Sequence, residues 1–130
     1  SKRPLCIGTF MLAETLYRAG DLAAARERYY TAIELDENHL EARASLACVL
    51  AEQGDVELAI AALEGVLRQQ PEYADAHWHL AGIYGEVGCE EKAEHHLLRF
   101  LSVAPDSPWA DLAHEKLSQR RLNSIQDMTE

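Results

Sequence analysis

Residues 40–71 read LEARASLACVLAEQGDVELAIAALEGVLRQQP, and this stretch decides the fold. Apolar residues recur at helical spacing in both halves: at Leu40, Leu46, Val49 and Leu50, then at Ala59, Ile60, Leu63, Val66 and Leu67. Gly54, between the halves, can adopt the left-handed backbone that ends one helix, and Asp55 can cap the next. Pro71 cannot continue a helical ladder and ends the second helix. The stretch therefore predicts a helix–turn–helix hairpin.

The pattern occurs three times, with turn glycines 34 residues apart at Gly20, Gly54 and Gly88. Other positions repeat at the same spacing: Leu12, Leu46 and Leu80; Ala13, Ala47 and Ala81; Ala25, Ala59 and Ala93; Tyr29, Leu63 and Leu97. Pro71 and Pro105 close the second and third units, whereas Glu37 stands in the first. A repeat of this length predicts hairpins that stack to cover one another's apolar faces.

The 34-residue hairpin resembles the tetratricopeptide repeat (TPR) family, and the resemblance covers residues 6–107. It implies an all-α fold, a right-handed α-solenoid of three helix-turn-helix hairpins with a capping helix. The expected TPR domain spans residues 1–121, with repeats at about 6–39, 40–73 and 74–107, a capping helix at 108–121 and a flexible tail at 122–130. Helices are expected at 5–19, 22–36, 40–53, 56–70, 74–87, 90–103 and 108–121.

Some positions depart from the family's pattern. The large residue early in each first helix is replaced by Thr9, Arg43 and His77. The small residue late in each second helix is replaced by Phe100 in the third unit. We therefore expect Phe100 to contact the segment that follows it rather than another repeat.

The capping helix is expected to begin at Pro108, because proline favours the first helical position. Its expected buried stripe comprises Trp109, Leu112, Ala113 and Leu117. Its expected polar outer face comprises Asp111, Glu115, Ser118 and Arg121. Thr15 stands where Val49 and Ile83 would pack against a preceding unit, which indicates that the first hairpin is the other end of the array.

The chain has 130 residues, 22 acidic and 12 basic side chains and a formal net charge of −10. This balance disfavours nucleic acid and anionic membrane surfaces as partners, because both attract clustered Lys and Arg. Cys6, Cys48 and Cys89 are an odd number without a CxxC motif, which predicts reduced thiols and a cytoplasmic location, with the periplasm as an alternative. The absence of an initiator Met suggests a piece of a longer protein or a processed product.

The stretch HWHLAGIYGEVG at residues 77–88 raises the question of a metal or phosphate site. Gly88 is a turn glycine after a helix, whereas a phosphate loop precedes one. His77 and His79 are two apart and diverge on a helix, and pairs four apart, such as Asp75 with His79, supply only two ligands. No Ser, Cys or His arrangement indicates a nucleophile with its base. We therefore expect no enzyme activity, no cofactor and no metal.

In the TPR family the first helix of each hairpin lines a concave groove where ligands bind. The resemblance places twelve candidate ligand-binding residues in that groove: Phe10, Met11, Glu14, Tyr17, Glu41, Ser45, Cys48, Asp75, Trp78, His79, Gly82 and Glu86. Phe10, Met11 and Trp78 are the expected apolar anchors. The alternative is that the aromatic rings cover each other or a helix end, and for Tyr17 both remain open.

The groove floor carries small residues, notably Gly82 and Gly85, which favours close approach of a guest backbone or, alternatively, crowding against Trp78. Its charge is acidic, with Glu14, Glu41, Glu52, Asp75 and Glu86 against Arg18. A merely solvated acidic face is the alternative. Some family members clamp a C-terminal carboxylate, but the corresponding positions here are Phe10, Glu14, Ser45, Asp75 and His79, so a chaperone-tail ligand is not expected.

The sequence thus predicts a non-catalytic protein–protein interaction scaffold that binds a peptide or helix, basic or amphipathic, in its groove. No nucleic-acid binding and no membrane insertion are expected. Two alternatives remain: a TPR appendage of a larger multidomain enzyme or regulator, and a self-association module.

Overall fold

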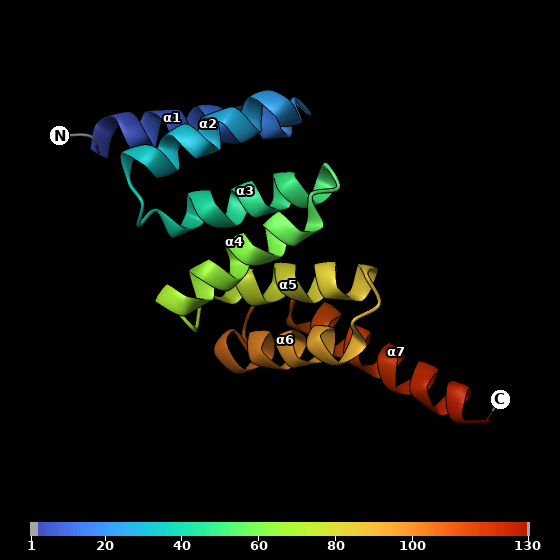
Figure 1. The fold of residues 1–130 in the computed structure, drawn as a ribbon. Coiled ribbons are helices and arrows are strands. Elements are labelled where there is room, and N and C mark those ends of the chain that lie inside the picture. The colour runs from blue at the N-terminus through green and yellow to red at the C-terminus, as the bar shows by residue number, and fades with distance from the viewer. Residues whose placement is uncertain (1–2, 130) are drawn as a thin grey trace. The chain divides into compact units, whose positions relative to one another are not determined.

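The computed structural model describes residues 3–129, and within them it contains seven helices and no strand (Figure 1). The helices are α1 (Arg3–Arg18), α2 (Leu22–Leu35), α3 (Leu40–Glu52), α4 (Val56–Gln69), α5 (Ala74–Glu86), α6 (Glu90–Val103) and α7 (Ala110–Thr129). They form two compact units, which meet in the chain between Pro71 and Glu72. Unit 1 contains α1–α4, and unit 2 contains α5–α7.

The three hairpin turns follow from their glycines. Gly20, Gly54 and Gly88 have φ angles of 85°, 87° and 83°, a region that costs glycine no side-chain clash. Just after each glycine a backbone N–H donates to a carbonyl one turn inside the preceding helix, as in Asp55 to Leu50 at 2.8 Å. These turns confirm the predicted helix–turn–helix hairpins.

Of the two aspartates that were predicted to cap a helix, one does so. The Asp21 carboxylate accepts the Ala24 N–H at 3.2 Å and so caps α2. Asp55 makes no side-chain cap bond to α4. Its carboxylate instead accepts from the Arg26 guanidinium at 2.6 Å, which ties the start of α4 to α2. A charged donor within reach has displaced the neutral backbone N–H.

Unit 1 buries a core between its two hairpins, and α2 packs against α3. The fully buried residues include Ala25, Tyr29, Leu50, Leu63 and Val66, all on the stripes that the repeat predicted. Cys6 is also buried, at 1% exposure, and its thiol donates to the Ala32 carbonyl at 3.3 Å.

Unit 2 consists of the α5/α6 hairpin with α7 packed on α6. Its main cluster joins Ala81, Leu97 and Phe100 to Ala113 and Leu117 of α7. Phe100 is 2% exposed, and its packing against α7 confirms the expectation that it contacts the following segment.

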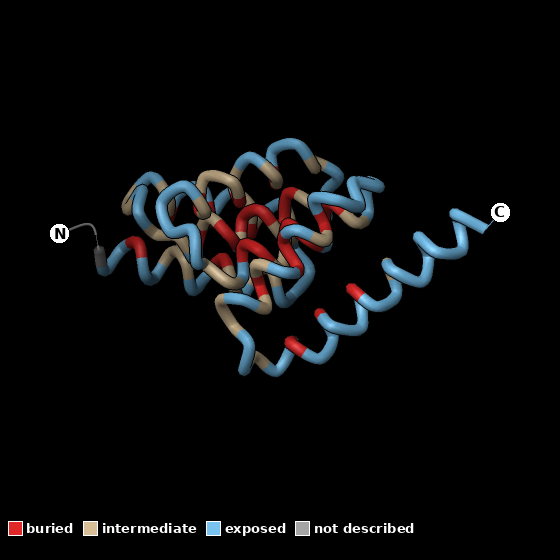
Figure 2. Tube along the Cα trace, turned by 90° about the horizontal axis from the view of Figure 1, so that it is seen from below, coloured by how far each residue is buried: buried red, intermediate tan, exposed pale blue. Residues whose placement is uncertain are grey.

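The boundaries and buried face of α7 differ from the prediction. The helix begins at Ala110 instead of Pro108, and its backbone remains helical to Thr129 instead of ending at 121, so the tail expected from residue 122 is helical. Its buried residues are Ala110, Ala113 and Leu117, while Trp109 and Leu112 are 46% and 43% exposed. Ala113 and Leu117 are thus buried as predicted, whereas Trp109 lies before the helix and Ala110 is buried in place of Leu112. Figure 2 shows buried positions only in the first half of α7.

No helix within residues 3–129 has both the length and the apolar character that crossing a membrane requires.

Candidate ligand-binding surface

The candidate residues come from the first helix of each hairpin, α1 and α3 in unit 1 and α5 in unit 2. The two groups are described separately. We call the residues on α1 and α3 the unit 1 face: Ile7, Phe10, Met11, Glu14, Tyr17, Glu41, Ser45, Cys48 and Glu52.

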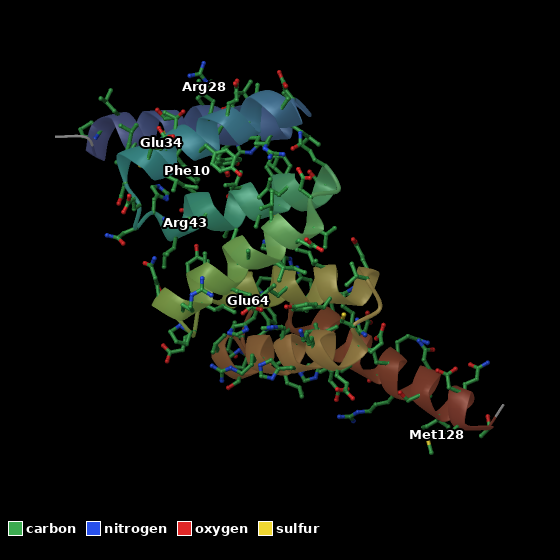
Figure 3. All side chains as sticks on the ribbon, in the orientation of Figure 1. Phe10, Arg28, Glu34, Arg43, Glu64 and Met128 are labelled. Carbon is green, nitrogen blue, oxygen red and sulfur yellow. The ribbon has the colours of Figure 1, made fainter. Side chains whose placement is uncertain are left out.

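Phe10 packs largely on its own unit. Its ring lies 4.6 Å from the His39 ring and 6.1 Å from the Tyr29 ring, measured between centroids. His39 is also the residue before α3, and its Nδ1 accepts the Ala42 N–H at 3.0 Å. Figure 3 shows the Phe10 ring on the side of the first hairpin that faces α3. Phe10 therefore joins α1 to the start of α3, and only part of its ring is left for a ligand.

Glu14 and Ser45 serve a buried tyrosine. The hydroxyl of Tyr29, a fully buried residue, donates to the Glu14 carboxylate and is also hydrogen-bonded to the Ser45 side chain. Burial raises the pKa of Tyr29 above its ordinary value, and the hydrogen bond to Glu14 raises it further. Part of the polar side of the unit 1 face thus provides hydrogen-bond partners for a core residue.

Tyr17 bridges the two first helices of unit 1. Burial is the main cause that raises the pKa of its phenol, followed by the nearby Cys48 and Glu52, and the Glu52 carboxylate also accepts its hydrogen bond. Because Tyr17 is on α1 and Glu52 is on α3, this contact supports the alternative in which the ring covers the chain itself.

Two apolar side chains of the unit 1 face remain open to solvent. Met11 is 62% exposed and Ile7 is 48% exposed. Glu41 and Glu52, both exposed, supply negative charge on α3. An exposed methionine is adaptable in shape and common on peptide-binding surfaces. These residues form the accessible part of the unit 1 face, and of them Met11 and Glu41 were predicted from the sequence.

In unit 2 the predicted anchor Trp78 packs against aromatic rings of its own unit. Its ring centroid lies 5.1 Å from that of Phe100 and 5.2 Å from that of Trp109. It also packs against the buried cluster between α5, α6 and α7. Trp78 is therefore a half-buried structural residue, as the alternative to a free anchor had proposed.

The two groove glycines of α5 differ in their surroundings. A Cβ built on Gly82 would meet nothing within 4 Å. A Cβ on Gly85 would lie 2.6 Å from Nη2 of Arg120, on α7. Arg120 also forms an ion pair with Glu90 at the start of α6. At Gly85 the expected close approach is made by an arginine of the chain's own last helix.

The remaining predicted residues of α5 are polar. Asp75 and Glu86 are exposed, and His79 is half-buried. Burial lowers the pKa of His79, while the nearby Asp75 acts in the opposite direction. Within residues 3–129 no three His, Cys, Asp or Glu side chains are arranged to hold a metal ion.

A histidine pair that the sequence did not predict lies inside unit 2. Nδ1 of His77 and Nδ1 of His96 are 3.0 Å apart, and both residues are buried. Burial, followed by His77, His95 and Lys92, lowers the pKa of His96 to about 4. The available signal was His77 itself, which stands at a position of large packing residues.

Comparisons with known proteins agree with this geometry. Two sequence models described as tetratricopeptide repeat match residues 10–63 and 50–114. The TPR repeat-containing thioredoxin TTL4 of Arabidopsis thaliana is 37% identical over 82 residues, which are 63% of this chain and 12% of that protein. The chain therefore spans a small part of that relative's length.

Two solved structures illustrate the fold. The translocator chaperone SycD of Yersinia enterocolitica superposes with a TM-score of 0.84 at 19% identity, covering 92% of this chain and 93% of that one. YrrB, described as a TPR protein with an unusual peptide-binding site, has a TM-score of 0.75 at 29% identity, covering 82% of this chain and 55% of that one. The fold class is thus the predicted α-solenoid of helical hairpins with a capping helix, and the chain belongs to the tetratricopeptide repeat family.

Proposed function

We propose that this chain is a non-catalytic scaffold that binds a peptide or a helix of a partner protein on the first helices of its hairpins. The family supports a role in protein interaction, and YrrB, a relative by structure, is described by its peptide-binding site. The observation that carries the proposal is the exposure of Met11 at 62% and Ile7 at 48%, on a face that also carries the exposed Glu41 and Glu52.

The partner's chemistry follows from that face. Exposed apolar side chains favour an apolar anchor on the partner. Glu41 and Glu52 favour Lys or Arg beside that anchor, because charge complementarity orients the encounter. The proposed ligand is therefore a basic, amphipathic segment. Met11 is its central anchor, because the rings of Trp78 and Phe10 are partly covered by contacts within their own units.

The same role can belong to a larger protein. The TPR repeat-containing thioredoxin matches this chain along 12% of its own length. This favours, as a second candidate, a binding module attached to an enzyme or regulator whose chemistry lies elsewhere.

Titration of labelled peptides tests the proposal. The peptides are amphipathic helices that differ only in carrying Lys or Glu beside their apolar residues. Each peptide is titrated into the parent chain, the Met11→Glu variant and a control variant. The control, Leu58→Glu, alters a 52% exposed leucine on α4. We expect the Lys peptides to bind the parent and the control alike, and Met11→Glu at least tenfold more weakly. Preferential binding of Glu peptides, or equal binding by Met11→Glu, would overturn the proposal.

A further inference from the structure

The first helix, α1, exposes repeat positions that the other first helices bury. Leu12 is 43% exposed, whereas its equivalents Leu46 and Leu80 are 5% and 0% exposed. Gly8 and Thr15 are exposed too. Their equivalents on α3 and α5 are buried: Ala42, Val49, Ala76 and Ile83. In unit 1, α3 packs against α2, the second helix of the hairpin before it, whereas α1 is the first helix that the structure describes.

These positions form one exposed side of α1. They recur every three or four residues, which places them in a line along a helix. We call this line the α1 stripe, and its residues are Leu5, Gly8, Leu12 and Thr15. Leu5 is 64% exposed. Met11 and Ile7 of the unit 1 face lie about a quarter turn or more around the helix from the middle of the stripe, so the stripe is a different surface.

Gly8 has no function that its own unit explains. It lies inside α1 and lacks the positive φ angle of the turn glycines. A Cβ built on it would meet nothing within 4 Å. Glycine destabilises a helix interior relative to alanine. A small residue does, however, allow a second helix to approach closely, because the distance between packed helices depends on the side chains at the contact.

The α1 stripe is complementary to itself. Leu5 and Leu12 stand three and four residues from Gly8, on opposite sides of it. If two such helices cross antiparallel at Gly8, Leu5 of each copy meets Leu12 of the other. A two-fold contact between identical chains requires this reciprocity.

The charge of the chain favours a second copy at this stripe. No residue from Pro4 to Ala13 is charged, although the whole chain has a formal net charge of −10. Two copies repel each other over most of their surfaces, and least where both surfaces are uncharged. A basic partner would instead be attracted to acidic residues elsewhere on the chain.

We propose that two copies of this chain associate through their α1 stripes, which cross antiparallel at Gly8. Leu5 of each copy packs on Leu12 of the other, and the contact closes a two-fold dimer. One helix pair is smaller than a standard interface of about 800 Å² per partner, so association is expected only at micromolar concentration. This inference goes beyond the proposed function, because it uses a different side of α1.

Sedimentation velocity from low to high micromolar concentration tests the dimer. We expect the parent to shift from monomer to dimer, and added salt to strengthen the association because it screens the repulsion between two acidic chains. Leu12→Glu should weaken the association at least tenfold. The matched control, Leu98→Glu, makes the same change at a 48% exposed leucine of α6 and should associate as the parent does. A parent that stays monomeric overturns the inference.

Gly8→Leu separates close helix packing from general apolar adhesion. Its added side chain starts in open space, so the monomer should keep its fold, which circular dichroism checks. At a close crossing the larger side chain holds the two helices apart, and the association should weaken at least tenfold. An apolar patch that merely adheres would associate more strongly, and that result overturns the crossing at Gly8.

Opposite charges at the two leucines test the antiparallel arrangement. Leu5→Lys and Leu12→Glu should each associate at least tenfold more weakly than the parent. Their equimolar mixture should associate more strongly than either variant alone, because the crossing places the introduced lysine beside the introduced glutamate. A mixture no stronger than its components overturns the arrangement.

Peptide titration keeps this inference distinct from the proposed function. Leu12→Glu should bind the Lys peptides as the parent does, while its self-association is lost. If no Lys peptide binds the parent but the parent dimerises and Leu12→Glu does not, the proposed function is wrong and the dimer is supported. If the peptides bind a parent that is monomeric throughout, only the dimer is wrong.

Discussion

The two units use the same repeat positions to make different cores. The position of Tyr29 in unit 1 is that of Leu97 in unit 2. Tyr29 carries a buried hydroxyl, and Glu14 and Ser45 serve it as hydrogen-bond partners. Leu97 has no such group, and its neighbourhood is instead filled by Phe100, Ala113 and Leu117.

This difference decides which side chains are available to a ligand. In unit 1 the hydroxyl of the buried tyrosine uses polar residues as hydrogen-bond partners, and the apolar Met11 remains exposed. In unit 2 the rings of Phe100 and Trp109 both pack at a tilt against Trp78, so the groove residue with the largest ring is held in place. A single residue on the second helix of a hairpin, Phe100, thus affects how far Trp78 on the first helix is available to a ligand.

Phe100→Ala should have the largest effect on this comparison. It installs the residue that unit 1 has at the same position, Ala32, yet it removes the ring that joins α6 to α7. We expect the free energy of unfolding, measured in urea, to fall by about 3–5 kcal/mol because a buried phenylalanine leaves a cavity. Leu98→Ala, at a 48% exposed leucine, is the matched control. Equal losses in the two variants would contradict the role given to Phe100.

Unit 2 should be the acid-sensitive unit. The pKa of His96 is lowered from 6.5 to about 4, so the unfolded chain binds more protons than the folded chain between these pH values. Its contribution to stability is therefore present above pH 6.5 and is lost as the pH falls toward 4, by at most about 3 kcal/mol.

Urea unfolding of the parent and of His96→Leu across this pH range measures that contribution. The slope of stability against pH should be shallower in His96→Leu than in the parent. The exposed His114→Leu is the control and should keep the parent's slope. If His96→Leu retains the full slope, the acid sensitivity arises from other groups.

Tyr29→Phe tests the polar network of unit 1. The substitution keeps the ring and leaves Glu14 and Ser45 without the shared hydroxyl. We expect the free energy of unfolding to fall by about 1–2 kcal/mol, since removing one partner of a buried hydrogen bond costs about this much. Tyr30→Phe, at a 41% exposed tyrosine, should change it little. A neutral Tyr29→Phe would show that solvent replaces the hydroxyl without loss.

The smallest expected effects come from the two glycines of α5. Gly82→Ala adds a Cβ to open space and should raise the free energy of unfolding by about 0.5–1 kcal/mol through helix propensity. Gly85→Ala gains the same propensity but displaces the Arg120 guanidinium, so its net gain should be smaller. Thermal unfolding of both variants measures the difference. Equal gains would show that Arg120 moves aside freely.

The fold could be predicted from the sequence because the residues that indicate it recur in each repeat. Gly54 and its equivalents need φ angles that other residues avoid, and small residues such as Ala59 recur where helices pack closely. Each helix of the first three hairpins was therefore placed to within a few residues. The end of α7 was not, because residues 122–129 have no buried stripe and every one of them is exposed.

The candidate surface was harder to predict for a related reason. The rings of Phe10 and Trp78 contact Tyr29 and Phe100, which stand at repeat positions. They also contact His39 and Trp109, which lie in the connections before α3 and α7. Neither belongs to the repeated pattern, so the register gave no sign of them. The position of a groove residue followed from periodicity, but its exposure depended on residues that occur once.

Because Cys6 is buried, the reaction of its thiol with an alkylating reagent reports local opening of the structure. None of the three cysteines is in a disulfide, and Cys89 is exposed while Cys6 is 1% exposed against α2. Burial raises the pKa of the Cys6 thiol, which further slows its reaction with alkylating reagents. Cys89 should therefore be modified at once, and Cys6 only when α1 separates from α2. The rate at Cys6 then measures how often the first hairpin opens.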